Sequence, residues 1–103
     1  MASHAIRVIA PNQTELVTTK NTVRRTIFFS YETPVVIRYD YNYGLPKEYK
    51  GEDASELFVT SEKYSVTTSK HINKYLDGLP AESVSQGEIY RLSDVMDREE
   101  VRQ

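Results

Sequence analysis

His71 and the serines that precede it are the residues whose types could support nucleophilic catalysis. Ser65 and Ser69 stand close to His71 in the sequence. An imidazole activates a hydroxyl only when it lies within hydrogen-bond reach of it and is itself oriented by a third group. His71 instead falls on the flank of an apolar helical stripe, where a ring packs and one nitrogen bonds a nearby carbonyl or hydroxyl. The sequence therefore predicts a structural role for His71 and no catalytic residue, with contact to a ligand as the alternative.

A cluster of hydroxyl side chains marks the start of the same predicted helix. Ser65, Thr67 and Thr68 lie where the exposed N–H groups of a first helical turn bind phosphate readily. The same hydroxyls are good N-caps, and a capping bond stabilises a helix by about 0.5–2 kcal/mol. Capping is therefore the favoured interpretation, and an anion site formed by these three residues is the alternative.

Basic side chains that the fold would bring to one surface form a second candidate site. They are Arg24, Arg25, Arg38, Lys70 and Lys74. Arg24 and Arg38 share the polar face of the predicted sheet, so the set could contact phosphates. The chain as a whole has 13 basic and 15 acidic residues and a net charge of −2, which is not the basic balance typical of nucleic-acid-binding domains. A solvated surface is favoured, with a modest phosphate-binding surface as the alternative.

Several kinds of chemistry are excluded by residue types that the sequence lacks. It has no cysteine, so disulfides, zinc–thiolate sites and thiol nucleophiles are ruled out. His4 and His71 are too far apart to show a metal-ligand spacing, and the four glycines are dispersed rather than gathered in a phosphate-binding loop. We therefore expect no metal, no cofactor and no enzymatic activity. The absence of a long apolar run or a signal peptide favours the cytoplasm, away from membranes.

The strongest pattern in the sequence is an alternation over residues 23–43. Its odd positions are nearly all apolar or aromatic and include Tyr39, Tyr41 and Tyr43, whereas most even positions are polar. Period-two alternation predicts strands with one buried face. The three tyrosines are thus interpreted as core, with a stacking platform for single-stranded nucleic acid as the alternative. Because the odd register continues across Pro34, a bend there is favoured over a hairpin.

The remaining segments complete the predicted order of elements. Weak strands are expected over residues 5–9 and 15–19, and a strand over residues 57–60. A helix over residues 67–76 would place Ile72, Tyr75 and Leu76 on the apolar face that carries the tyrosines. A short strand over residues 88–92 and a short helix over residues 93–101 would follow.

These elements predict an α+β fold in a single domain, residues 1–103, with its most clearly patterned part at 23–78. The sheet would be small and antiparallel, with four to five strands. One helix would pack on one face of it, and a second short helix would lie at the C-terminus. The 103 residues are enough for one small core.

Two segments of this chain form a pattern that resembles a known family. Residues 29–36 read FSYETPVV, and residues 63–76 read KYSVTTSKHINKYL. They resemble a family of small, uncharacterised bacteriophage proteins with an SYxTPV strand and a YSxTTSKHIxK helix start, and the resemblance covers about residues 27–77. It implies a phage origin, and it brings no activity with it.

The predicted function is that of a small non-enzymatic phage accessory protein that binds a host or phage protein. The contact would use either an exposed sheet edge, which also allows a homo-oligomer, or the polar loop over residues 44–56. Lys47, Tyr49 and Lys50 are the candidate binding residues of that loop. The alternative function is a nucleic-acid-binding module that uses Arg24, Arg38, Lys70, Lys74 and the helix start. His71 is a further candidate binding residue.

Overall fold

A twisted sheet with a helix on each face forms the described part of the chain, residues 3–41 and 55–94 of a computed structural model. The elements in chain order are β1 (Ser3–Ala10), β2 (Gln13–Lys20), β3 (Val23–Ser30), β4 (Thr33–Asp40), β5 (Ser55–Thr60), α2 (Val66–Leu76), β6 (Glu82–Val84) and α3 (Gln86–Asp94).

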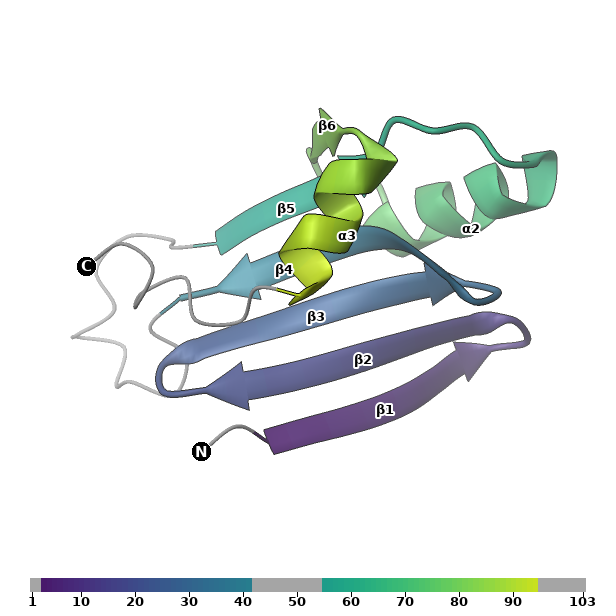
Figure 1. Ribbon diagram of the computed structural model, residues 1–103. Helices are drawn as coiled ribbons and strands as arrows, with labels where there is room; N and C mark the ends of the chain where they lie inside the picture. Colours follow the sequence, from purple (N-terminus) through teal and green to yellow (C-terminus); the bar gives the residue numbers. More distant parts are fainter. Residues whose placement is uncertain (1–2, 42–54, 95–103) are drawn as a thin grey trace.

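The strands pair in the order in which they occur along the chain, β1-β2-β3-β4-β5-β6 (Figure 1). Neighbouring strands are antiparallel from β1 to β5, and β6 runs parallel to β5. The α+β class is thus confirmed. The predicted sheet of four to five strands was too small, because the described residues form six, and the sixth has only three residues.

The stretch 23–43 turns back as a hairpin, so the predicted bend at Pro34 was wrong. The turn lies at Tyr31 and Glu32, and Tyr31 adopts a positive φ of 58°. Next to the turn, an odd residue pairs with an even one, since Phe29 opposes Pro34. A bulge between Phe28 and Phe29 then shifts the register by one residue. Beyond the bulge odd residues oppose odd residues, which imitates the unbroken alternation of one long strand.

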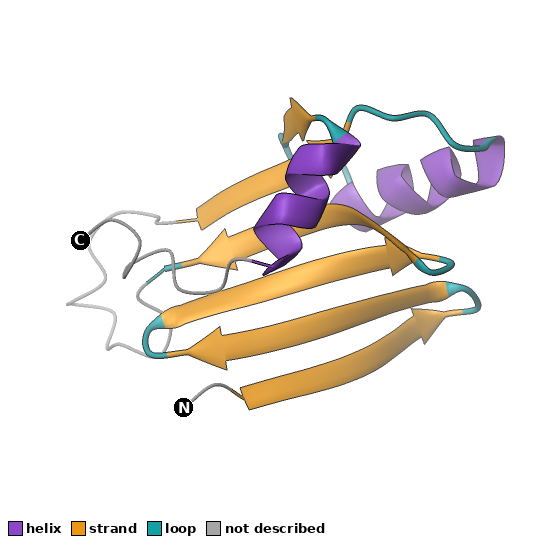
Figure 2. Cartoon of the chain, in the orientation of Figure 1, coloured by secondary structure: helices purple, strands orange, loops and turns teal. Residues whose placement is uncertain are grey.

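Each face of the central strands is covered by a different helix (Figures 1 and 2). We call the side covered by α3 the front face and the side covered by α2 the back face. The front core joins Ile89 and Leu92 of α3 to a set of sheet residues. That set is Val23, Ile27, Ile37 and Tyr39, with Leu16, Phe29, Tyr41 and Phe58 partly buried beside it.

The predicted packing of the 67–76 helix was therefore on the wrong face. The stripe of Ile72, Tyr75 and Leu76 contacts Phe28 and Val36 on the back face, and the rings of Phe28 and Tyr75 stack with centroids 4.0 Å apart. Phe28 and Val36 interrupt the apolar/polar alternation because they serve this second core. The odd face that holds the tyrosines is buried under α3 instead. Tyr39 is fully buried there, as the core interpretation predicts.

Helix α2 begins and ends close to the predicted positions. Ser65 is its N-cap, with Oγ accepting a hydrogen bond of 3.0 Å from the backbone N–H of Thr68. At the other end, Asp77 and Gly78 both have positive φ values, of 49° and 81°. These left-handed residues end the helix in the way that glycine commonly does.

The C-terminal part differs most from the prediction. Residues 88–92, predicted as a strand, belong to helix α3, and residues 82–84, for which no element is predicted, form β6. Ser85 starts the helix, because its Oγ accepts a hydrogen bond of 3.1 Å from the N–H of Glu88. Ile89 and Leu92 are three residues apart, so both point into the core. Of the predicted helix over residues 93–101, Ser93 and Asp94 close α3, and residues 95–101 lie outside the described residues.

A buried cation fastens the end of α3 to the sheet. Arg25 is only 6 % exposed, and its Nη1 donates to the carbonyl oxygens of Leu92, at 3.2 Å, and Ser93. The Tyr39 hydroxyl donates to the same Leu92 carbonyl at 2.7 Å. A positive charge at a helix C-terminus is favourable because the free carbonyls there carry partial negative charge. Arg25 thus breaks the alternation for a structural reason.

No helix in the described residues is long and apolar enough to cross a bilayer.

The front core gives the first testable prediction. Ile89 is fully buried, whereas Leu79 is half exposed. We expect Ile89→Ala to lower the free energy of unfolding by about 2–5 kcal/mol, because it leaves a cavity under α3. The matched control Leu79→Ala should change it by about 0.5 kcal/mol or less. Urea unfolding followed by circular dichroism measures both, and equal losses would show that α3 is not a core element.

Candidate functional site

Strand β1 is the long, uncovered edge of the sheet. Its side chains are exposed on both faces from Ser3 to Ile9, and Ile6 and Val8 are 76 % and 75 % exposed. Neither helix covers it, since α3 packs on β3, β4 and β5 and α2 packs on the back of the same central strands (Figure 1). Only Lys74 and Tyr75, at the end of α2, come near β1 on its back face. The outer side of β1 therefore offers backbone N–H and C=O groups that no strand among the described residues pairs with.

A shallow apolar pocket of about 300 Å³ adjoins this edge on the front face. Ile6 of β1 opposes Leu16 of β2 in the strand register, and the two line the pocket together with Phe29 and Tyr31. Tyr31 is half exposed. The remaining lining residues are Thr14, Glu15 and Glu32. The edge strand and this pocket form one continuous surface, which we call the edge surface.

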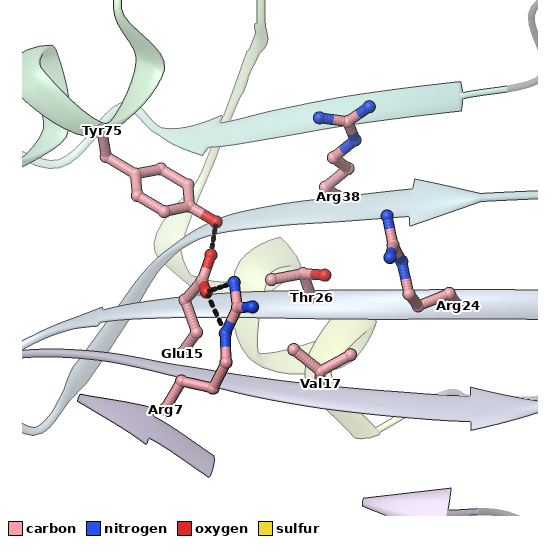
Figure 3. A pocket seen from close by; sticks show the side chains of 7 residues that line it. All are labelled: Arg7, Glu15, Val17, Arg24, Thr26, Arg38 and Tyr75. Carbon is pink, nitrogen blue, oxygen red and sulfur yellow. Dashed lines mark hydrogen bonds and ion pairs between the residues drawn. The ribbon is translucent and has the colours of Figure 1, made fainter. Parts of the chain in front are cut away.

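The back face carries a polar pocket of about 210 Å³ beside the end of α2 (Figure 3). Three arginines from three strands, Arg7, Arg24 and Arg38, surround it, and Val17 and Thr26 lie side by side between them. The apolar stems of the long arginine side chains cover this part of the sheet, which α2 borders only through Tyr75.

A buried carboxylate organises one wall of that pocket. Glu15 is 6 % exposed, and its Oε1 accepts hydrogen bonds from Arg7 Nη2 at 2.5 Å and Arg7 Nε at 3.1 Å. Its Oε2 accepts from the Tyr75 hydroxyl at 2.5 Å (Figure 3). Burial and this bond to the carboxylate raise the pKa of Tyr75 far above its usual value. The tyrosine therefore stays neutral and links α2 to β1 through Glu15.

Asp40 pairs with the other two arginines. Its Oδ2 lies 3.1 Å from Arg24 Nη2, and its Oδ1 lies 3.0 Å from Arg38 Nε. The hydroxyl of Ser55 also donates to Oδ1, at 2.8 Å. Burial alone would raise the pKa of Asp40, but the hydrogen bonds from Ser55 and Arg24 and the charge of Arg38 outweigh it and hold the pKa below its usual value.

The fold brings together only some of the basic residues that the sequence analysis places on one surface. Arg24 and Arg38 line the same pocket on the back face, as the sequence predicts, and Lys74 lies beside Arg7 at a neighbouring pocket of about 340 Å³. Lys70 is exposed on α2 and lines none of these three pockets. Arg25 points to the front face and is buried. Arg7 was missed in the sequence, although its spacing from Glu15 about the turn at Pro11 and Asn12 makes the two residues direct cross-strand partners.

His71 does meet a serine, but a different one from those that the sequence suggested. Its Nδ1 lies 2.8 Å from the Oγ of Ser30 at the end of β3, and its ring packs 5.7 Å, centroid to centroid, from that of Tyr31. Ser30 is 2 % exposed. A substrate could not reach its hydroxyl, so the contact does not have the geometry of a nucleophile and its base. The pair fastens α2 to the sheet, which agrees with the structural role predicted for His71.

The predicted anion site at the helix start is engaged in the same network. Thr68 Oγ1 accepts hydrogen bonds of 3.2 Å from the hydroxyls of both Ser30 and Ser65. Thr67 is exposed. Two of the three hydroxyls are thus used for capping and for joining α2 to β3. The network joins the segments 29–36 and 63–76, since Ser30 belongs to the first and Ser65 and Thr68 to the second.

The candidate binding residues of the polar loop, Lys47, Tyr49 and Lys50, lie outside the described residues, as does Tyr43. Among residues 3–41 and 55–94, no group of three or more histidine or acidic side chains is placed to hold a metal ion.

The fold and these surfaces define a small α+β protein whose described residues form a six-stranded sheet with a long edge at β1 and a short edge at β6. The chain matches the model of a family of unknown function, DUF8033, over residues 4–91, and it belongs to that family. The match runs from the start of β1 into α3, so it includes the edge surface and the arginine pocket. No curated protein and no solved structure matches the chain.

The Asp40 contacts give the second prediction. Asp40→Asn should lower the free energy of unfolding at neutral pH by about 1–3 kcal/mol, because it removes the charge that Arg24 and Arg38 share. A carboxylate whose folded pKa is lowered contributes stability above its unfolded pKa and loses it as the pH falls through the folded value. The difference between wild type and variant should therefore shrink below about pH 4. Urea unfolding at pH 7 and pH 3 measures it, and a constant difference would contradict the assignment.

Proposed function

We propose that this protein is a small non-enzymatic binding protein of bacteriophage origin, an accessory factor that binds a host or phage protein in the host cytoplasm. The observation that carries the proposal is strand β1, an eight-residue edge strand whose side chains are exposed from Ser3 to Ile9. The edge surface would be the contact. The resemblance of the SYxTPV and YSxTTSKHIxK motifs to phage proteins supports the proposed origin.

The composition of β1 supports a binding role over a merely solvated edge. Soluble proteins usually protect an edge strand with proline, lysine, shortness or a bulge. Strand β1 contains no lysine or proline, and its irregularity falls only at its end, between Val8 and Ala10. Arg7, its one cation of constant charge, is turned to Glu15 on the back face. Ile6 and Val8 on the front face thus remain available to an added strand.

One observation also favours a second function, the binding of nucleic acid. The back face gathers Arg7, Arg24 and Arg38 around one pocket, with Lys74 nearby. Arginine donors that three strands bring to one face suit a phosphate backbone. Their charge is reduced by Glu15 and Asp40, for which reason protein binding is the function we place first.

A lysine on β1 tests the protein-binding function. Val8→Lys puts a charge on the edge surface, and Val66→Lys is a matched control because Val66 is 73 % exposed on α2. We expect wild type and Val66→Lys, immobilised separately, to capture the same proteins from a lysate of the phage's host during infection. Val8→Lys should capture at least about tenfold less of these proteins, which corresponds to a loss of roughly 1.4 kcal/mol in binding free energy. Equal capture by all three would contradict a role for the edge surface.

Salt-dependent retention tests nucleic-acid binding. On immobilised single-stranded oligonucleotide, the second function predicts retention at about 50 mM salt and elution as salt rises. Arg38→Gln should elute earlier, whereas Arg91→Gln, at an exposed position of α3, should elute with wild type. Flow-through of wild type at about 50 mM salt would exclude this function, and equal elution of the variants would exclude the arginine pocket as its site.

A further inference from the structure

We propose that the partner seated on the edge of β1 is a second copy of this chain, paired β1 to β1 in antiparallel fashion about a two-fold axis. This inference rests on the binding role proposed for the edge surface, and it identifies the phage protein bound there as the chain itself. The dimer would join two six-stranded sheets into one continuous sheet.

Geometry limits the registers that such a pair can take. In an antiparallel pair, residues directly opposite each other point to the same face. A two-fold axis perpendicular to the sheet keeps each front face at the front. An odd-numbered residue must therefore lie opposite an odd-numbered residue of the second copy, and an even-numbered residue opposite an even-numbered one. The two-fold axis then passes beside one residue, which lies opposite its own copy. In the middle of β1 the choices are Ala5, Ile6 and Arg7.

The side chains select Ile6. An axis at Arg7 would set two guanidiniums directly opposite each other, and like charges in that position destabilise a pair. An axis at Ala5 would leave Val8 beyond the end of the partner strand. An axis at Ile6 sets Ile6 against its own copy, Val8 against His4 and Arg7 against Ala5, so the most exposed apolar residues of β1 are covered.

The charges of β1 suit a copy of itself. The strand has no acidic residue, and its ionisable side chains, His4 and Arg7, have partners within their own chain. Arg7 Nη2 lies 2.5 Å from Glu15, and His4 Nδ1 lies 3.0 Å from the Thr18 hydroxyl. Pairing in the Ile6 register therefore leaves no charge that needs a counter-ion from the partner.

The front face gains from the same register. Ile6 opposes Leu16 within the chain. In the dimer Ile6 would also lie opposite Ile6 of the second copy, so that Leu16 and Ile6 of both copies would form one continuous apolar row across the front face. Burying these side chains removes apolar surface from water, which favours association of the two copies.

The sheet also explains why the assembly would stop at two copies. Its edges in the described residues are β1, with eight residues, and β6, with three. A chain with one long edge closes as a dimer when that edge is used, whereas two long edges would allow a growing sheet.

Thiol cross-linking reports the register directly, because the chain has no cysteine. In the proposed dimer the Cβ atoms at position 6 lie about 4.5–5.5 Å apart, close to what a disulfide needs. We expect Ile6→Cys to oxidise to a covalent dimer at least about tenfold faster than Val66→Cys, the exposed control on α2. Val8→Cys alone should remain unlinked, and a mixture of His4→Cys and Val8→Cys should link to each other.

Light scattering on wild type and Val8→Lys completes the test. Wild type should have twice the 11.9 kDa mass of one chain, and Val8→Lys should have the mass of one. A monomeric wild type, or Ile6→Cys that links no faster than Val66→Cys, overturns the dimer. If capture of another protein still depends on Val8 in that case, the binding role stands and only self-pairing falls. If that capture is also unaffected by Val8→Lys, both proposals fail.

Discussion

The width of the sheet relative to its helices is the constraint on which the rest of the structure depends. Strands lie about 4.8 Å apart, so six of them span roughly 24 Å from edge to edge. A helix with its side chains is about 10 Å across, so one helix on each face covers two or three strands. The front and back cores accordingly centre on β3 and β4. Strand β1 is left bare because the described residues contain no third helix to cover it.

Arginine is used for two different tasks where the helices end. Arg25 is buried beneath α3, and the carbonyls at the end of that helix stabilise its charge by accepting hydrogen bonds. Arg24 and Arg38 lie on the open back face and share the carboxylate of Asp40. The first arrangement places α3 on the sheet, and the second shields the part of β3 and β4 that α2 leaves uncovered. The same geometry that makes the back face stable also gathers the cations on which a phosphate-binding role would depend.

Much of the fold could be predicted, because alternation and helical periodicity are local. Helix α2 and the burial of Tyr39 followed from them. Two features could not be predicted in this way. The bulge at Phe28 and Phe29 restores odd-to-odd pairing, so a hairpin has the alternation of a continuous strand. The burial of α3 depends on contacts with β3 and β4, which are distant in sequence. Without those contacts, the local sequence of residues 88–92 favours a short strand.

The candidate site shows the same division between local and distant information. The Ser30–His71 contact joins residues 41 positions apart, and no spacing rule connects them. Arg7 and Glu15 face each other across a short turn, so their pairing was within reach of a hairpin prediction. The exposure of Ile6 and Val8 could not be predicted in this way, since an apolar side chain in a strand is normally expected to be buried. Ile6 and Val8 are exposed because both helices pack on the central strands, and this arrangement is visible only in the assembled sheet. The proposal of a partner strand at β1 rests on this uncovered edge.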